Sequence, residues 1–175
     1  MVPFTLRAAG PADARELTRV QVLCWKQTYS AMLPAGFFTP EHEASRLAQW
    51  RRVLADPACQ VALAEGSDGG LLGFAMAAKP FGEAAAGLPV GRQLYSLYVL
   101  AEHHGTGAGR ALLDAVLGTA PAVLWVAQGN ARAIAFYRRN GFAPDGTTMT
   151  DPAIPGITEV RMLRVGQPPH PGSIS

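Results

Sequence analysis

The residues His104-Gly105-Thr106-Gly107-Ala108-Gly109-Arg110 lie between an apolar run, Leu94–Leu100, and a helical pattern, Ala111–Leu117. A strand that turns through glycines into a helix directs several backbone N–H groups at one point, and the positive end of the helix dipole adds to them. Glycine also leaves no Cβ between the backbone and a bulky anion. This stretch predicts either an anion site, usually for phosphate, or a plain strand-to-helix turn.

Two common phosphate-binding motifs do not fit these residues. The glycines alternate, so the dinucleotide fingerprint G-x-G-x-x-G is not met, and no Lys-Ser or Lys-Thr follows them as in a Walker loop. A nucleoside-triphosphate-binding module is therefore disfavoured, and the pattern favours a phosphate cradle of another kind.

Composition places the chain among ordinary globular proteins. Its 175 residues suit one domain, and 49% apolar against 16% charged residues excludes a disordered chain. A net charge of +2 without a basic cluster argues against nucleic acid as a partner. Lys26 and Lys79 are the only lysines among 15 basic residues, which with the abundant alanine and glycine indicates a GC-rich bacterial genome.

The sequence gives no sign of a membrane partner, a disulfide or a metal. No apolar stretch could span a bilayer and the first residues lack a signal-peptide pattern, so we expect a cytoplasmic protein. Cys24 and Cys59 are far apart, without metal or redox spacing, and we expect reduced core thiols rather than acyl carriers. The histidines form no zinc-binding pattern.

Hydrophobic periodicity predicts an α/β protein with a mixed sheet. Strands are expected at Phe4–Ala8, Gln60–Glu65, Leu71–Ala78, Gln93–Leu100, Ala122–Ala127, Phe142–Asp145 and Ile157–Arg164. Helices are expected from Asp13 to about Tyr29, from Thr39 to Asp56, over Ala111–Leu117 and over Ala131–Asn140, with Asp13 (paired with Glu16), Thr39 and Asn130 as N-terminal caps. The remaining segments read as a turn at Pro34–Gly36, a long loop over Lys79–Arg92 and a disordered tail at Gly166–Ser175.

Right-handed crossovers in such a sheet place the glycine stretch and the start of the Asn130 helix at the same edge. That helix carries a second pattern, Asn130-Ala131-Arg132-Ala133-Ile134-Ala135-Phe136-Tyr137-Arg138-Arg139-Asn140-Gly141-Phe142. Asn130, Ala133 and Tyr137 share one helix face, and the small Ala133 leaves room for a ligand along it. Phe136 and Tyr137 alone would read as core aromatics.

Together the two stretches resemble the signatures of the GNAT superfamily of acyl-CoA-dependent N-acyltransferases. The first, (Arg/Gln)-x-x-Gly-x-(Gly/Ala), is matched by residues 104–109 with His104 in place of Arg or Gln. The second, Asn-x-x-Ala-x-x-Phe-Tyr-x-x-x-Gly-Phe, is matched by residues 130–142. The likeness extends to the order of elements from Phe4 to Leu163. It implies one domain over residues 1–165, a mostly antiparallel sheet with a central parallel strand pair, and flanking helices.

The resemblance also implies acetyl-CoA as co-substrate, no metal, and a role for each matched residue. The strand edge Leu97-Tyr98-Val99 would hydrogen-bond the pantetheine arm. His104, with one hydrogen bond to offer, would stand near the diphosphate, which the amides of Gly105, Thr106, Gly107, Ala108, Gly109 and Arg110 would hold. The thioester end would be lined by Asn130, Ala133, Phe136 and Tyr137.

The chemistry of amide formation fits these groups. An alkylamine, with a pKa of ~10.4, must lose a proton before it attacks the thioester. A backbone N–H such as that of Val99 can stabilise the oxyanion, and Tyr137 can act as general acid toward the departing thiolate. We therefore predict transfer of an acetyl group to a primary amine of a small molecule or a protein. The alternative is a non-catalytic acyl-CoA-binding or regulatory domain.

Several features stay open at this stage. Gln93 occupies the strand position where many relatives place a catalytic glutamate, and Glu65, Glu102, Glu159 or a water chain could serve instead. Trp25 and Tyr29 share a helix face and either pack against the sheet or form a wall of the amine pocket. The fold is also compatible with a homodimer.

Overall fold

The computed structural model describes residues 3–30, 33, 36–81, 87–150 and 156–165. Within them, seven strands form a single sheet in the order β1-β2-β3-β4-β5-β7-β6. Only the β4–β5 pair of this described sheet is parallel. The strands are β1 (Phe4–Ala8), β2 (Gln60–Gly66), β3 (Leu71–Ala78), β4 (Arg92–Val99), β5 (Ala122–Ala127), β6 (Ala143–Thr150) and β7 (Thr158–Arg164).

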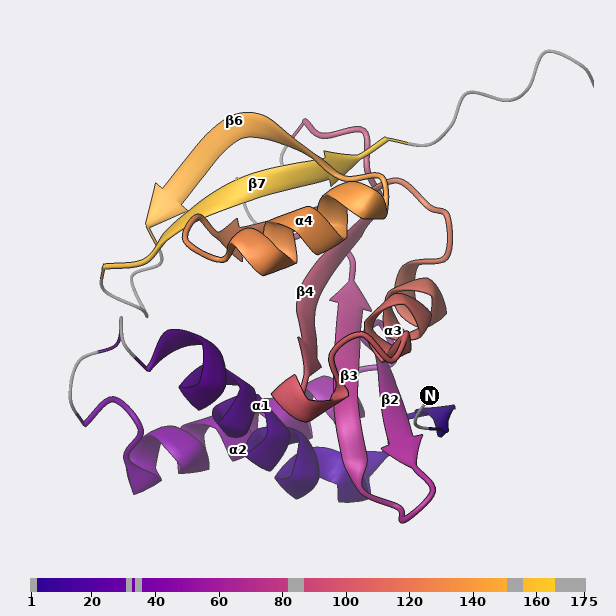
Figure 1. Ribbon diagram of the computed structural model, residues 1–175, viewed down its shortest axis with the longest axis vertical. Coiled ribbons are helices and arrows are strands. Elements are labelled where there is room, and N and C mark those ends of the chain that lie inside the picture. The colour runs from indigo at the N-terminus through magenta and orange to yellow at the C-terminus, as the bar shows by residue number, and fades with distance from the viewer. Residues whose placement is uncertain (1–2, 31–32, 34–35, 82–86, 151–155, 166–175) are drawn as a thin grey trace, which may run out of the picture.

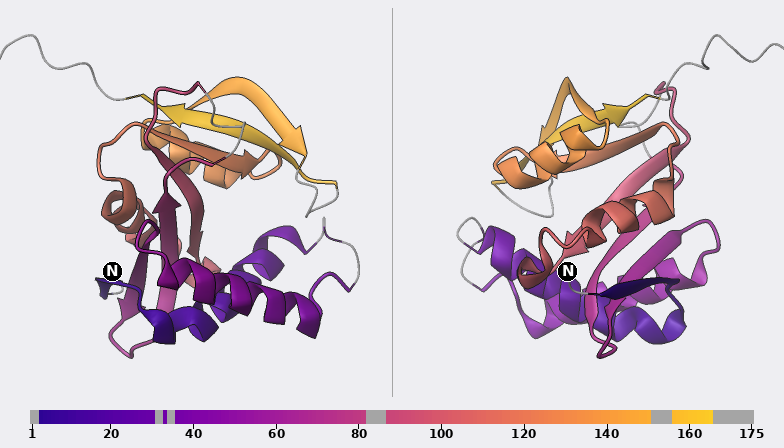
Figure 2. Two further views of the ribbon diagram at one scale, coloured as in Figure 1. Left: turned by 180° about the vertical axis from the view of Figure 1, so that it is seen from behind. Right: turned by 45° about the vertical axis from the view of Figure 1, so that its right-hand side comes forward.

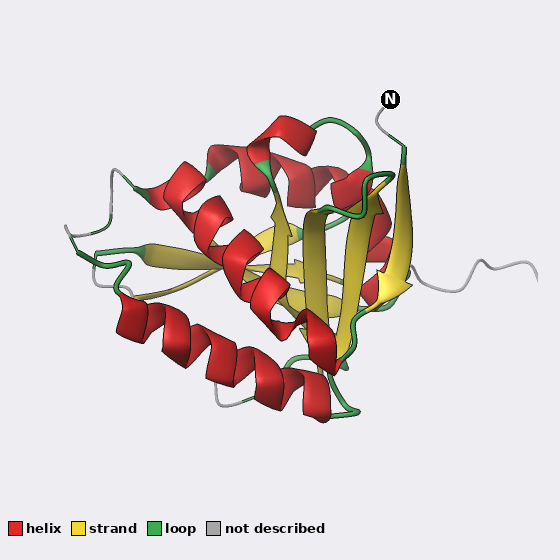
Figure 3. Cartoon of the chain, turned by 90° about the horizontal axis from the view of Figure 1, so that it is seen from below, coloured by secondary structure: helices red, strands yellow, loops and turns green. Residues whose placement is uncertain are grey.

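Helices cover both faces of this sheet (Figure 1). They are α1 (Ala14–Tyr29), α2 (Pro40–Ala55), α3 (Ala108–Leu117) and α4 (Ala131–Arg139). Because side chains alternate along a strand, Val61 and Leu63 of β2 pack in the core beneath α1 and α2, while Ala62 and Ala64 pack beneath α3. Figure 3 shows α1 and α2 lying side by side across the first of these faces.

The β4 and β5 strands separate soon after they meet. Their pairing joins residues 92–94 to residues 122–124, and β4 then continues through Val99 without β5 beside it. The β5, β6 and β7 strands with α4 therefore form one group, and β1 to β4 with α1 and α2 form another (Figures 1 and 2). The sheet thus has an opening near its middle.

Gly73 of β3 brings the backbone of β3 unusually close to the end of β4. A Cβ placed on Gly73 would lie 2.4 Å from the carbonyl oxygen of Tyr98 and 2.9 Å from the Cα of Val99. Next to it, the Leu100 amide donates to the Leu72 carbonyl at 2.9 Å. Gly73 therefore helps to fix where β4 runs as it leaves β5.

The predicted mixed sheet, with a central parallel pair and flanking helices, is confirmed. Most expected elements agree with the structure to within one residue at either end. The expected caps also form at two helices, since Thr39 Oγ1 accepts from the His42 amide and Asn130 Oδ1 accepts from the Ala133 amide.

Three expectations about local structure were wrong. The third helix begins at Ala108 rather than Ala111, because its first turn tolerates Gly109. Asp13 does not cap α1: its carboxylate accepts from the Gly10 amide at 2.7 Å and binds Arg7, which lowers the pKa of Asp13. The β6 strand continues past Asp145 to Thr150, because its pairing with β7 resumes at Thr148 after a register shift that follows Pro144.

Some expectations fall on residues outside those described. They are the tail at residues 166–175, residues 34–35 of the predicted turn and residues 82–86 of the long loop. Within the described part of the chain, no helix combines the length and apolar character needed to cross a membrane.

Replacing Gly73 with alanine tests the close approach of β3 and β4. The added Cβ collides with backbone rather than with a flexible side chain, so Gly73→Ala should lower the free energy of unfolding by roughly 1–3 kcal/mol, measured by urea denaturation. Gly91→Ala is the matched control, because its Cβ would meet nothing within 4 Å. Equal stability of the two variants would contradict this account.

Candidate active site

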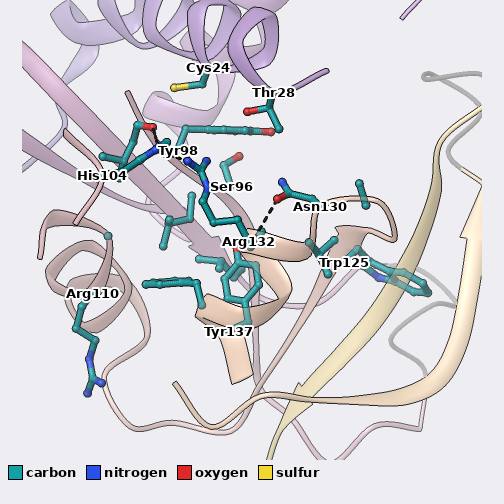
Figure 4. A pocket seen from close by; sticks show the side chains of 18 of the residues that line it. Cys24, Thr28, Ser96, Tyr98, His104, Arg110, Trp125, Asn130, Arg132 and Tyr137 are labelled. Atoms are coloured by element: carbon teal, nitrogen blue, oxygen red, sulfur yellow. Dashed lines mark hydrogen bonds between the residues drawn. The ribbon is translucent and has the colours of Figure 1, made fainter. Parts of the chain in front are cut away.

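A cavity of about 460 Å³ lies where β4 and β5 separate (Figure 4). Its lining comes from both faces of the sheet: Val126 belongs to the core under α4, whereas Trp125 and Ala127 alternate with it and face the other way. The cavity therefore passes through the sheet, so that two molecules could meet in it from opposite faces.

The glycine stretch forms one end of this cavity. Gly105 and Gly107 have φ angles of +78° and +93°, a region that side chains other than glycine rarely adopt. A Cβ on either would meet nothing within 4 Å, so open space lies over the loop. The Ala111 amide donates to the Gly107 carbonyl, and the amides before it in the first turn of α3 have no intrahelical acceptor. This end can hold an anion.

His104 connects the two sides of the opening. Its Nε2 lies 2.8 Å from the Val99 carbonyl oxygen and its Nδ1 lies against the Arg132 guanidinium of α4. Since the carbonyl can only accept and the guanidinium can only donate, these partners select the neutral tautomer with the proton on Nε2. Figure 4 shows Arg132 reaching across the cavity toward His104. His104 thus bonds the protein itself at this point.

The exposed edge of β4 offers backbone groups to the cavity. The Leu100 amide bonds β3, and residues of an antiparallel ladder alternate in direction. The amides of Leu97 and Val99 therefore turn away from β3, toward the side where β5 has separated. An extended chain laid in the opening could pair with them as an added strand would.

The α4 helix contributes the opposite wall. Asn130 caps it through a 3.1 Å bond from the Ala133 amide, and Ala133, Phe136 and Tyr137 line the cavity. Edge contacts with Phe136 and Phe142, at ring-centroid distances of 5.3 and 5.9 Å, hold the Tyr137 ring. Burial raises the pKa of Tyr137, so its hydroxyl stays protonated over the neutral range.

Aromatic side chains from α1 line the far end. Tyr29 borders the cavity, and its hydroxyl accepts a 3.4 Å bond from Asn130 Nδ2. Trp25 lies behind it, 7% exposed, and donates from Nε1 to the Tyr98 hydroxyl at 2.8 Å. The Trp25 ring is also stacked on Phe37. Trp25 therefore supports this wall from behind rather than lining the cavity.

Most residues singled out in the sequence meet at this cavity, and three do not line it. Its lining includes Tyr29, Leu97, Tyr98, Val99, His104, Gly105, Gly107, Gly109, Arg110, Asn130, Ala133, Phe136 and Tyr137. Trp25, Thr106 and Ala108 lie just outside. The Thr106 hydroxyl instead donates to the His103 carbonyl and closes the turn into α3.

Sequence reasoning missed several residues of the lining. Arg132 and Arg139 add positive charge to the cavity that Arg110 also lines, and Trp125 is a further lining residue. Of the candidate bases named from the sequence, Glu159 lines the cavity, whereas Glu65 and Glu102 are not among its lining residues. Arg132 follows the predicted cap Asn130 by two residues, and this spacing could have suggested that Arg132 lies in the first turn of the helix. Nothing in the sequence alone distinguished Glu159 from Glu65 and Glu102, because only strand pairing places it opposite Ala127.

Neither cysteine is suited to carry an acyl group. Cys24 borders it, but burial raises the pKa of this thiol to about 12, which keeps it protonated and unreactive. Cys59 is half-buried elsewhere, and burial raises its pKa as well. The described residues contain no group of three or more side chains suited to hold a metal ion.

Comparison with known proteins gives this geometry a family. The model of the Acetyltransferase (GNAT) family matches residues 25–142, which include both signature stretches. The chain belongs to the GNAT acetyltransferase family. An uncharacterized N-acetyltransferase of Mycobacterium tuberculosis (strain ATCC 25618 / H37Rv) is 34% identical to it over 147 residues, covering 77% of this chain and 86% of that protein.

Solved structures share the GNAT fold along almost the whole chain. One is described as histone acetyltransferase HPA2 and related acetyltransferase from Corynebacterium glutamicum, with 23% identity, a TM-score of 0.70, and coverage of 97% of this chain and 99% of that one. Another is the PaiA N-acetyltransferase of Thermoplasma acidophilum in complex with coenzyme A, with 18% identity, a TM-score of 0.61, and coverage of 91% and 98%. At these identities the likeness establishes the fold.

Asn130 offers a direct test of how α4 is held. Asn130→Ala removes the acceptor for the Ala133 amide and should lower the free energy of unfolding by about 1 kcal/mol. Asn130→Asp keeps an acceptor oxygen and adds a negative charge at the positive end of the helix, so it should retain most of the stability. Urea denaturation of the three proteins measures this, and an alanine variant as stable as the parent would rule out the cap.

Proposed function

We propose that this GNAT protein transfers an acetyl group from acetyl-CoA directly to a primary amine of a small molecule or a protein. The observation that carries the proposal is the cavity through the sheet, with a glycine turn suited to an anion at one end and a buried phenol beside the opening. The coenzyme A complex of the Thermoplasma relative adds support from the same fold.

The residues present fit coenzyme A. Open space over Gly105 and Gly107 suits a diphosphate, as do the amides of Gly109 and Arg110, which have no acceptor within the helix. The Ala108 amide instead donates to the Thr106 hydroxyl at 3.4 Å. Arg110, Arg132 and Arg139 border the same cavity and would neutralise further phosphate charge. The amide of Leu97, which also faces the opening, would donate to a carbonyl group of the pantetheine arm.

The chemistry follows from what these groups can do. Acetyl-CoA supplies a thioester, whose carbonyl carbon is open to attack by an amine that has given one proton to solvent and is neutral. The C–N bond forms as the C–S bond breaks, and the second proton that the nitrogen loses balances the one that the departing thiolate takes up. The Val99 amide, turned into the opening, would donate a hydrogen bond to the oxyanion that develops there. The narrow cavity would hold the two substrates together and thereby replace a covalent acyl-enzyme step.

Tyr137 would serve as the general acid. Burial raises its pKa, so the phenol is protonated and ready to donate at every pH from ~6 to ~10. A thiol of pKa ~8.5 is the stronger acid, so the phenol gives up its proton only as negative charge builds on sulfur. Hydrogen bonding in the transition state would therefore carry most of its effect.

A thiol-release assay with acetyl-CoA and a panel of primary amines tests the proposal. We expect coenzyme A to be released only when an amine is present, and calorimetry to show binding of acetyl-CoA and coenzyme A but not ATP. Binding of acetyl-CoA without turnover on any amine or peptide would instead indicate a non-catalytic acyl-CoA-binding domain.

The substitution Tyr137→Phe removes the hydroxyl but keeps the ring, so it tests the hydroxyl alone. The variant should lower kcat by roughly 10²-fold while the acetyl-CoA dissociation constant stays nearly unchanged, because the ring still packs against Phe136 and Phe142. Steady-state kinetics and calorimetry give the two quantities separately. An unchanged kcat would remove the assignment, and a matching thermal melt would show that the fold is intact.

A further inference from the structure

His104 and Arg132 meet at the rim of the cavity. Both residues are exposed, and the imidazole Nδ1 accepts from the guanidinium while Nε2 donates to the Val99 carbonyl. The same two residues also line an outer cavity of about 320 Å³, so open space lies on both sides of their contact. Because water competes for both groups, an exposed hydrogen bond to a neutral ring contributes little to stability, and it can open at low cost.

Arg132 differs from Arg110, which also borders the cavity. The Arg110 guanidinium donates to the Asp114 carboxylate at 2.7 Å and to the Asn140 side-chain oxygen at 2.8 Å, and Figure 4 shows it directed away from His104 and Arg132. Arg132 takes part in none of the ion pairs among the described residues, and its guanidinium ends on the neutral imidazole. The charge of Arg132 is therefore available to an anion.

The contact between these two side chains lies directly beside the glycine stretch. His104 precedes Gly105, and both line the cavity with Arg132. A diphosphate seated over Gly105 and Gly107 would thus reach the same end of the cavity as the Arg132 guanidinium. A phosphate oxygen accepts a charge-assisted hydrogen bond from arginine, which is roughly twice as strong as a bond to a neutral acceptor. The anion would therefore win the guanidinium from the imidazole.

We propose that Arg132 exchanges partners when the coenzyme binds: its guanidinium lies on His104 in the free protein and moves to the diphosphate in the complex. His104 keeps its hydrogen bond to the Val99 carbonyl throughout and so holds the end of β4 in place. This inference rests on the proposed use of acetyl-CoA and names the residue that detects its diphosphate. It also gives a role to the histidine that replaces Arg or Gln in the first signature, since His104 holds a cation ready for the phosphate.

Calorimetry with coenzyme A and with pantetheine, which lacks the diphosphate, tests the role of Arg132. Arg132→Gln removes the charge but keeps a donor for His104. It should weaken the binding of coenzyme A roughly tenfold, the effect of losing a hydrogen bond between charged groups, while the binding of pantetheine should change little. Arg138→Gln is the control, because it removes the same charge from an exposed position of α4 outside the cavity lining.

Three results of this comparison would overturn the proposal. In the first, Arg132→Gln binds coenzyme A as tightly as the parent protein. In the second, it loses coenzyme A and pantetheine equally, which would mean that Arg132 shapes the cavity without contacting the diphosphate. In the third, Arg138→Gln weakens coenzyme A binding as much as Arg132→Gln does, which would reduce the effect to a general attraction between α4 and an anion.

His104→Leu tests the exchange itself. Leucine offers no acceptor, so Arg132 is free before the coenzyme arrives and no hydrogen bond is broken on binding. Coenzyme A should therefore bind roughly threefold more tightly. The gain should vanish when Arg132→Gln is also present, which separates it from any effect at the Val99 carbonyl. Weaker or unchanged binding by His104→Leu would contradict the exchange, and so would a gain that persists without Arg132.

Failure of this inference is distinguishable from failure of the proposed function. A parent protein that binds neither coenzyme A nor acetyl-CoA, or that binds them and releases no thiol with any amine, would refute acetyl transfer. A parent protein that binds both and releases thiol, with Arg132→Gln and His104→Leu matching its affinity for coenzyme A, would refute the exchange alone.

Discussion

The separation of β4 from β5 is the constraint on which the rest of the structure depends. Parallel pairing stops after three residues on each strand, and from there the backbone of β4 faces an opening instead of a neighbour. Polar backbone groups in the middle of a sheet are costly to leave without partners. His104 provides a partner for one of these groups, the Val99 carbonyl.

The two ends of the cavity differ because two different parts of the sheet enclose it. The α3 and α4 helices both lie on one face and bring the glycine stretch, three arginines and Tyr137. The opposite face of β5 and β7 brings Trp125 and Glu159, and the end of α1 brings Tyr29.

Local signals in the sequence were reliable where local physics decides the outcome. Thr39 and Asn130 cap helices because the side-chain oxygen of each accepts from a backbone amide three residues later. This bond forms within one turn and needs no contact with another part of the chain. The prediction that Asp13 caps α1 was wrong, because Arg7 of β1 binds the Asp13 carboxylate. The local sequence pattern does not reveal this contact. The predicted strand at Phe142–Asp145 ended too early, because pairing with β7 extends β6 to Thr150.

The sequence by itself determined the alternation of strands and helices, the glycine turn into α3 and the face shared by Asn130, Ala133 and Tyr137, since each follows from spacing along one segment. Only the tertiary structure decided how far β4 and β5 pair, that His104 bonds Val99 and Arg132, and that Glu159 rather than Glu65 or Glu102 borders the cavity. These depend on contacts between residues distant along the chain, and no local pattern encodes which strand will lie beside which.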